Sequence, residues 1–219
     1  MTSTVKAYKG LGMEGGLARW YDRTTRKDLP QIKTLANRIA AFVPSAAEVL
    51  EIAPGPGFLS IELAKRGLHV RAFDISKTFV EIASRNAAAE NAPAQFELGN
   101  ASALPVEDAS VDFVVCRAAF KNFTEPVKAL SEMRRVLRPG GTALLIDMRR
   151  DVQMAEIRKY VDELGVSRMN RWFMMFTFRN MLIKRAYSID DIRNMAKEAG
   201  WTTPQIESSP LGFEAWMKK

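Results

Sequence analysis

The chain is poor in the residues that most often bind metals or form cross-links. It has one cysteine, Cys116, and one histidine, His69, among 219 residues. A single cysteine excludes an internal disulfide, and no Asp/His cluster has metal-ligand spacing, so we expect no metal. His69 begins a predicted strand, away from its ligand end, and Cys116 lacks the preceding proline of a cytosine-methylating nucleophile. We therefore expect both residues to be structural.

Long apolar runs are also missing. No segment approaches the roughly 20 residues needed to cross a bilayer, and the N-terminal Met-Thr-Ser-Thr-Val-Lys lacks the apolar stretch of a secretory signal. We therefore expect a cytoplasmic protein without a transmembrane segment. With 47% hydrophobic residues, the chain is long enough for one domain with a sizeable core.

Positive charge gathers in the two flanks of the chain. Residues 1–48 hold eight Lys/Arg and four Asp/Glu (net +4), residues 49–148 hold eleven and twelve (net −1), and residues 149–219 hold thirteen and nine (net +4), which gives the overall +7. The sequence pI is near 9.6. Some attraction to polyanions follows from this charge, and it should fade with salt.

A glycine loop followed by an acid is the most informative pattern present. Residues 49–52 predict a buried strand, and Ala53-Pro54-Gly55-Pro56-Gly57 predicts a loop before a helix. Glycines let a ligand approach the backbone, and Asp74, which ends the next apolar run, can accept hydrogen bonds from both ribose hydroxyls. A dinucleotide or S-adenosylmethionine would suit this geometry. The loop lacks a third glycine, and Pro56 lacks an N–H for a phosphate, which favours S-adenosylmethionine.

Further motifs follow in order along the chain. Asp74 is followed by Asn100-Ala101-Ser102-Ala103-Leu104-Pro105 and then by Leu137-Arg138-Pro139-Gly140-Gly141. Together with Glu51–Gly57, they resemble the motifs of the class I S-adenosylmethionine-dependent methyltransferases, in particular the UbiE-like small-molecule group. The specific motifs cover roughly residues 45–148, and the remainder is similar in layout.

The resemblance implies where S-adenosylmethionine, and S-adenosylhomocysteine as product, would bind. Ala53 stands where the family usually has glycine, and Asn100 stands where an aspartate commonly accepts from the adenine amino group. Arg117 would offer its carbonyl to the methionine amino group, whereas Glu51 would balance the ammonium charge or brace the loop. The predicted cofactor-binding residues are Glu51, Ala53, Gly55, Gly57, Asp74, Ile75, Asn100, Ala101, Arg117, Tyr8 and Tyr21.

The segment after the predicted strand at 111–116 would lie near the reacting methyl group. It lacks the Asn/Asp-Pro-Pro-aromatic motif of enzymes that methylate exocyclic amines of nucleobases. Phe120, Asn122 and Tyr21 are the candidates near the methyl group, with Asn122 either steering an acceptor lone pair or ending a turn. No general base is evident, and methyl transfer can rest on proximity and orientation.

Strands and helices are predicted to alternate, which indicates an α/β fold with a mostly parallel sheet between helices. Asp28, Ser76 and a Ser188–Asp191 capping box predict helix starts. The resemblance implies a Rossmann-like, doubly wound, seven-stranded sheet of order 3-2-1-4-5-7-6 with strand 7 antiparallel. Strands are expected at about 48–53, 68–74, 94–98, 111–116, 142–146, 202–208 and 211–217, and helices at about 29–43, 58–66, 77–91, 126–137 and 189–199.

We expect a single methyltransferase domain over residues 1–219. Its parts are an N-terminal helical lid (1–48), the cofactor-binding core (49–148), a helical insert or lid (149–187), and the last helix with an edge hairpin (188–219). Gly10, Gly12, Gly15 and Gly16 lie between Tyr8 and Tyr21. This composition suits a segment that closes over a ligand; the alternative is a frayed terminus.

Residues 165–187 hold five Lys/Arg and no acid, interleaved with tryptophan, phenylalanine and methionine. Such a segment can wall a pocket for a bulky acceptor or pack on the core, and we favour these two interpretations. It can also touch an anionic membrane surface, stack on single-stranded nucleic acid, or form a homodimer face.

The predicted function is S-adenosylmethionine-dependent methyl transfer to an N or O atom of a hydrophobic, aromatic small molecule, such as a natural product or a quinone-like compound. The alternatives are an RNA or protein methyltransferase that uses the basic flanks and, less favoured, a nicotinamide-dependent oxidoreductase. The lack of the nucleobase motif argues against a nucleic-acid partner.

Overall fold

The structure is a computed structural model that describes residues 8–9, 12–163, 167–178 and 182–219. Gly10, Arg179 and three residues at 164–166, which entered the interpretation of the two flanks, lie outside these ranges.

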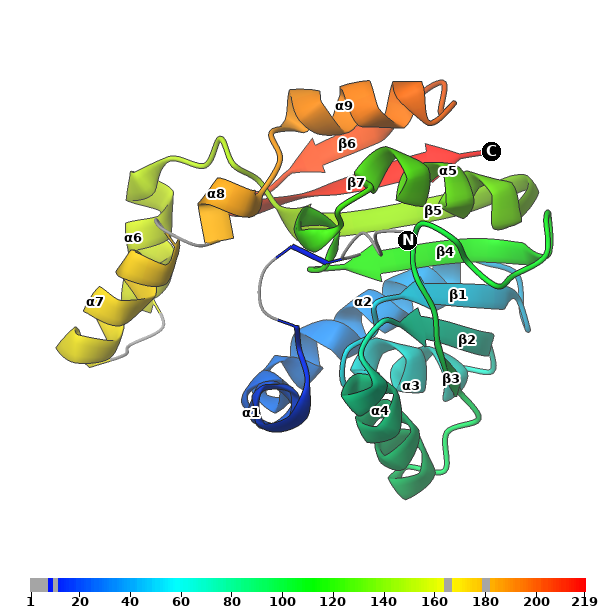
Figure 1. Ribbon diagram of the computed structural model, residues 1–219, viewed down its shortest axis with the longest axis horizontal. Helices are drawn as coiled ribbons and strands as arrows, with labels where there is room; N and C mark the ends of the chain where they lie inside the picture. Colours follow the sequence, from blue (N-terminus) through cyan, green and yellow to red (C-terminus); the bar gives the residue numbers. More distant parts are fainter. Residues whose placement is uncertain (1–7, 10–11, 164–166, 179–181) are drawn as a thin grey trace, which may run out of the picture.

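Seven strands form one sheet in the order β3-β2-β1-β4-β5-β7-β6 (Figure 1). The first five strands are parallel, whereas β7 runs antiparallel to both β5 and β6. The predicted fold class, strand order and antiparallel seventh strand are confirmed. The strands are β1 (Glu48–Ile52), β2 (His69–Asp74), β3 (Gln95–Leu98), β4 (Val111–Arg117), β5 (Leu137–Met148), β6 (Gln205–Ser208) and β7 (Gly212–Lys218).

Helices cover both faces of the sheet. The helical elements are α1 (Gly15–Thr25), η1 (Arg26–Asp28), α2 (Leu29–Phe42), α3 (Phe58–Ala64), α4 (Lys77–Ala89), η2 (Phe120–Asn122), α5 (Pro126–Val136), α6 (Met154–Glu163), α7 (Arg168–Thr177), α8 (Ile183–Arg185) and α9 (Ile189–Glu198). Among the described residues, none of these helices is long and apolar enough to cross a bilayer.

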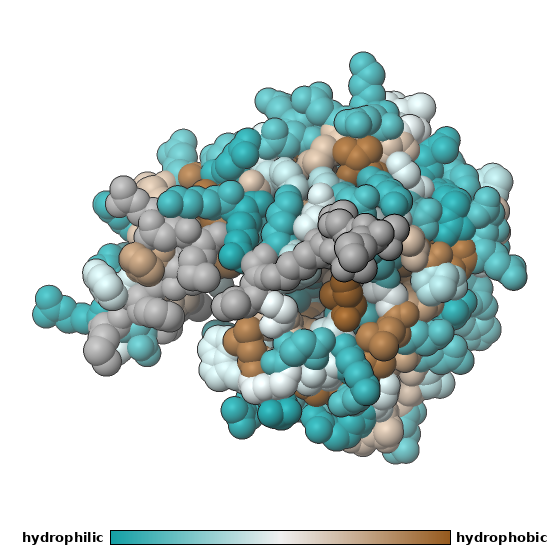
Figure 2. Space-filling model, viewed as in Figure 1, coloured by the Kyte–Doolittle hydropathy of each residue, from teal (hydrophilic) through white to brown (hydrophobic). Residues whose placement is uncertain are grey.

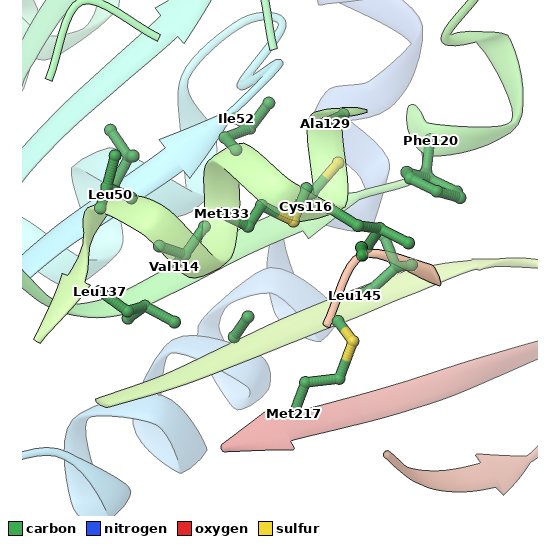
Figure 3. Packing of buried hydrophobic residues seen from close by; sticks show 14 of the residues in the cluster. Leu50, Ile52, Val114, Cys116, Phe120, Ala129, Met133, Leu137, Leu145 and Met217 are labelled. Atoms are coloured by element: carbon green, nitrogen blue, oxygen red, sulfur yellow. The ribbon is translucent and has the colours of Figure 1, made fainter. Parts of the chain in front are cut away.

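Alternate residues of the central strands feed two separate cores. Leu50 and Val114 belong to the core that α5 and α9 cover, whereas Val49 and Val115 belong to the core that α2 and α3 cover. Figure 3 shows the first of these cores, with Met133 of α5 packed over the strands. Burial on both faces explains why β1 and β4 are nearly continuous apolar runs.

Two of the three predicted helix caps form as expected. The hydroxyl of Ser76 accepts from the Phe79 N–H, and Ser188 with Asp191 makes a complete capping box. Asp28 does not cap α2 with its side chain, because it has φ −86° and ψ 0° at the end of a 3₁₀ turn instead of the extended conformation of a capping residue.

The fifth strand is longer than the sequence predicts. The turn expected at 137–141 lies within β5, because Leu137 already pairs with Val111 before the register shifts at Phe113. Gly140, with φ +84°, lies in this irregular stretch. In the glycine-rich segment before Tyr21, Gly15 is the first residue of α1.

Replacing Gly57 by alanine should destabilise the fold more than replacing Gly67. The two glycines have φ of +82° and +81°, a conformation that costs an L-residue about 1–2 kcal/mol. A Cβ on Gly57 would lie 2.8 Å from both the Ala83 Cβ and the Phe96 ring, whereas nothing lies within 4 Å of one on Gly67. Overpacking adds about 1–3 kcal/mol, so urea unfolding should separate the two variants by that amount. Equal losses of stability in the two variants would show that Ala83 and Phe96 move aside without a measurable cost.

Candidate functional site

A cavity of about 650 Å³ opens at the carboxyl ends of β1, β2 and β4. This is the edge at which parallel α/β sheets bind ligands, and the volume lies within the range of about 300–1,000 Å³ of ligand pockets. Most of the predicted site residues line it together. They are Tyr8, Tyr21, Glu51, Ala53, Gly55, Asp74, Ile75, Asn100, Ala101, Arg117 and Asn122.

Asp74, at the end of β2, supports the glycine loop. One carboxylate oxygen accepts from the Gly55 N–H at 3.1 Å, and the other accepts from the Ser76 N–H at 2.9 Å. The side chain is buried, which raises its pKa, and the two N–H donors oppose that rise. Asp74 thus positions the loop after β1 and presents a carboxylate to the cavity.

The loop adopts a left-handed turn at Ala53, the position where the resembled family usually has glycine. Its φ is +56°, and its N–H donates to the Phe73 carbonyl at 2.8 Å. Gly55 has φ +55°, and a Cβ there would meet only a Tyr21 ring carbon at 3.9 Å. The loop therefore keeps a glycine-like backbone at Ala53 and leaves open space beside Gly55.

Glu51 is a buried acid that faces the cavity from the end of β1. Burial raises its pKa to about 7, although the hydroxyl of Ser60 donates to it and Arg117 lies near enough to oppose the rise. A carboxyl with such a pKa changes charge readily near neutral pH. Ser60, on α3, was not among the sequence candidates.

Lys121, which lines the cavity, belongs to a buried ion pair with Asp147 that the sequence interpretation also missed. Lys121 Nζ lies 2.8 Å from Asp147 Oδ1 and donates to the Ala118 carbonyl at 2.7 Å, and the Lys121 N–H donates to Asp147 Oδ2 at 2.9 Å. Both residues are buried. Their positions after β4 and at the end of β5 are the signal that could have found them, because neighbouring parallel strands bring these positions together.

An N-terminal strap, here residues 8–9 and 12–14, contributes to the cavity wall. The Lys9 N–H donates to the Asn122 carbonyl at 2.7 Å, and Tyr8 forms an antiparallel bridge with Phe123. The Ser76 hydroxyl donates to the Met13 carbonyl, and the Glu14 carboxylate accepts from the first N–H groups of α4. The strap therefore contacts both the β4 side and the α4 side of the site.

The two tyrosines of this wall are protonated phenols at neutral pH. Burial raises the pKa of Tyr8 and of Tyr21, and nearby arginines only partly oppose the shift. They can therefore donate hydrogen bonds to a ligand.

Two predicted site residues do not line the cavity. Phe120 is fully buried in the core, where its ring lies against Phe123 and Tyr187 at centroid distances of 5.6 and 5.7 Å (Figure 3). The other two residues of the 3₁₀ turn η2, Lys121 and Asn122, line the cavity instead. Gly57 starts α3 and permits close packing against α4 and β3.

Neither of the two residues expected to be structural lines the cavity. His69 is exposed at the start of β2 and pairs with Glu48 at 2.8 Å. Cys116 is fully buried, and burial raises the pKa of its thiol well above the usual value, as is typical of structural cysteines. Within the described ranges, no group of three His, Cys, Asp or Glu side chains could hold a metal ion.

Comparison with known proteins shows what the chain is similar to. Residues 50–145 match the family model described as a methyltransferase domain. A similar crystal structure is that of a putative S-adenosylmethionine-dependent methyltransferase from Methanococcus maripaludis. It superposes with a TM-score of 0.77 at 25% identity and covers 96% of this chain and 95% of that one. The chain thus contains a stretch similar to a methyltransferase domain and has the fold of a structure described as an S-adenosylmethionine-dependent methyltransferase.

Curated relatives of this chain match over shorter stretches. Demethylmenaquinone methyltransferase of Deinococcus radiodurans is 38% identical over 109 residues, or 49% of this chain and 45% of that protein. An uncharacterized methyltransferase of Bacillus subtilis is 28% identical over 174 residues, or 78% of this chain and 64% of that one. The chain spans about half the length of the first curated relatives it matches.

The cavity residues fit the cofactor of the family, S-adenosylmethionine. A ribose diol needs a pair of acceptors, which the buried Asp74 carboxylate offers beside the open space at Gly55. A methionine ammonium needs an anion, which Glu51 offers once it is ionised. Ile75 is 48% exposed at the cavity and provides an apolar surface for a base.

Replacing Asp147 by asparagine should lower the free energy of unfolding by about 3–5 kcal/mol, because it leaves the buried Lys121 ammonium without a counter-ion. The matched control is Asp190→Asn, which removes an exposed partner of Arg193 and should cost at most about 1 kcal/mol. Chemical denaturation measures both changes. A loss in Asp147→Asn no larger than in the control would mean that the buried pair does not stabilise the fold.

Proposed function

We propose that this protein transfers a methyl group from S-adenosylmethionine to a hydrophobic, ring-containing small molecule. The observation that carries the proposal is one cavity in which Asp74, Glu51 and the loop at Gly55 meet a second, more apolar wall. That second wall comprises Tyr21, Phe123, Met148 and Leu182. The first group suits the cofactor, and the second suits an apolar acceptor.

Orientation accounts for the chemistry better than acid–base catalysis does. S-adenosylmethionine supplies an electrophilic methyl group on a sulfonium with a good leaving group. The chain must hold the two reactants in line and exclude water, which a walled cavity and the N-terminal strap can do. Tyr8 and Tyr21 can donate hydrogen bonds to an acceptor, but as protonated phenols they are poor bases.

The acceptor atom is the part of the proposal that product analysis must decide. The sequence favours a nitrogen or oxygen acceptor, since these carry a lone pair and need little help from a base. UbiE-like homologues methylate carbon, and a relative is named for a quinone-type substrate, demethylmenaquinone. We therefore propose amines, phenols and quinols as the acceptor class. An RNA or protein acceptor is the alternative because of the basic flanks.

The direct test is calorimetric binding of S-adenosylhomocysteine, with NADH titrated alongside. Micromolar binding of the former alone would support the proposal, and binding of NADH alone would overturn it. An acceptor screen with labelled S-adenosylmethionine should then label small aromatic amines, phenols or quinols. Labelling of RNA or protein alone would favour the macromolecular alternative.

Replacing Asp74 by alanine should weaken S-adenosylhomocysteine binding by about 1–3 kcal/mol, because the ribose hydroxyls lose their acceptor and the Gly55 N–H loses its partner. Asp112→Ala is the matched control, since Asp112 accepts from the Glu48 N–H at the opposite ends of β1 and β4. Calorimetry should find cofactor affinity unchanged in this control. Full affinity in Asp74→Ala would rule out its assigned role.

The affinity for S-adenosylhomocysteine should rise as the pH passes through about 7. Glu51, whose pKa is about 7, is neutral below that pH and attracts the ligand's ammonium only above it. If binding lowers this pKa by about one unit, the affinity gains about tenfold across the transition. Glu51→Gln should abolish the dependence, and Glu48→Gln, on the same strand, should keep it. A pH profile unchanged by Glu51→Gln would assign the titration to another group.

A further inference from the structure

Helices α6 and α7 form a part of the molecule that projects beside the sheet (Figure 1). They pack against each other and enclose a small core of their own, to which Ile157 and Val161 of α6 and Phe178 contribute. Figure 2 shows this part standing out from the body, with hydrophilic and hydrophobic side chains side by side. This core buries the apolar side chains between the two helices, so the side chains that α6 and α7 leave exposed need a separate explanation.

A groove on this part combines cationic and apolar side chains. Three arginines line it: Arg158, Arg168 and Arg171. The remaining lining residues are apolar: Met154, Trp172, Met175 and Phe176. No acid lines the groove, whose lining residues all belong to the described part of the chain.

Among the described residues, Trp172 is the most exposed of the large apolar side chains. It is 68% exposed, and its ring stacks on that of Phe176 with centroids 5.8 Å apart and an interplanar angle of 17°. The stack holds a broad amphipathic surface in place at the outside of α7. Exposed tryptophan beside arginine is typical of side chains that settle at a membrane interface, where the ring meets the acyl boundary and the guanidinium meets the headgroups.

The arginines of the groove differ in how they are neutralised. Arg171 pairs with Asp162 at 2.5 Å. Arg158 and Arg168 have no ion-pair partner within the residues that the structure describes. Two cations are thus left to meet an external anion beside an apolar surface.

We propose that the α6–α7 groove binds the anionic headgroups of a lipid bilayer, with Trp172 inserted at the interface. The two groups of side chains act together. The guanidinium groups attract the negative membrane surface, and insertion of the apolar stack keeps the protein bound there. This binding is independent of the proposed methyl transfer. It would place an apolar acceptor dissolved in the bilayer near the protein, since Leu182 and Arg185, which follow α7 in the chain, line the main cavity.

Charge and shape favour a bilayer over the other occupants. A second copy of the chain docking by the same face would bring like charges together, which is unfavourable in a two-fold interface. A single strand of nucleic acid needs open aromatic faces along a basic channel, whereas here the two rings cover each other on a helix that projects from the body.

The test is co-sedimentation of the full chain with vesicles of phosphatidylcholine alone or mixed with phosphatidylglycerol. We expect binding only to the anionic vesicles, weakened by salt, with tryptophan emission shifted to shorter wavelength. Arg168→Gln should weaken partitioning about fivefold, and Arg168→Gln with Trp172→Ala should weaken it further and remove the emission shift. The matched control is Arg19→Gln with Trp20→Ala on α1, where both residues are exposed and Trp20 is 54% exposed.

The control should bind vesicles as the unmodified chain does, and circular dichroism should show all variants folded. Equal losses in both double variants would overturn the proposal and assign the attraction to net charge alone. Unchanged binding in the α7 double variant would also overturn it. So would groove-dependent binding to an RNA oligonucleotide without vesicle binding, or a groove-dependent dimer seen by light scattering in its place.

Discussion

The site depends on the pair of backbone hydrogen bonds that Asp74 accepts. One bond holds the Gly55 N–H of the loop after β1, and the other holds the Ser76 N–H at the start of α4. Ser76 in turn caps α4 and donates its hydroxyl to the Met13 carbonyl. One carboxylate at the end of β2 therefore joins three segments that are remote in sequence: the glycine loop, the first turn of α4 and the N-terminal strap. Removing its charge would loosen all three at once.

The charged groups at the cavity differ in whether a counter-ion neutralises them. Lys121 and Asp147 neutralise each other, so they contribute shape and polarity without a net charge. Glu51 accepts hydrogen bonds from Ser60 and has a more distant arginine in place of a direct counter-ion, and burial holds its pKa near 7. A buried acid without a full counter-ion is costly to ionise, and a ligand cation would supply what is missing. This contrast, more than the number of charges, distinguishes a binding group from a structural one in the cavity.

Local patterns predicted the fold well, and contacts between distant segments were predicted poorly. The Ser76 cap and the Ser188–Asp191 box depend on residues three apart, so the sequence alone contains them. The strand order came from the resemblance, because adjacency in a sheet is not a local property. The Lys121–Asp147 pair was missed since it needs the register of β4 against β5. Phe120 was expected at the cavity because its position follows β4, but the 3₁₀ turn directs its ring into the core.

The positive charge of the chain has different uses in its two flanks. In the N-terminal flank, Arg26 bonds Asp22 and Asn86, and Arg38 pairs with Glu214 while lying over the Trp216 ring. These cations attach α1 and α2 to the body. In the other flank, Arg158 and Arg168 border an exposed apolar surface without such internal partners in the described ranges. A high pI is therefore a poor guide to function by itself, because much of the surplus is already spent on internal contacts. What matters is where cations lie beside apolar surface that the fold leaves uncovered, and in the described part of this molecule the α6–α7 groove is such a place.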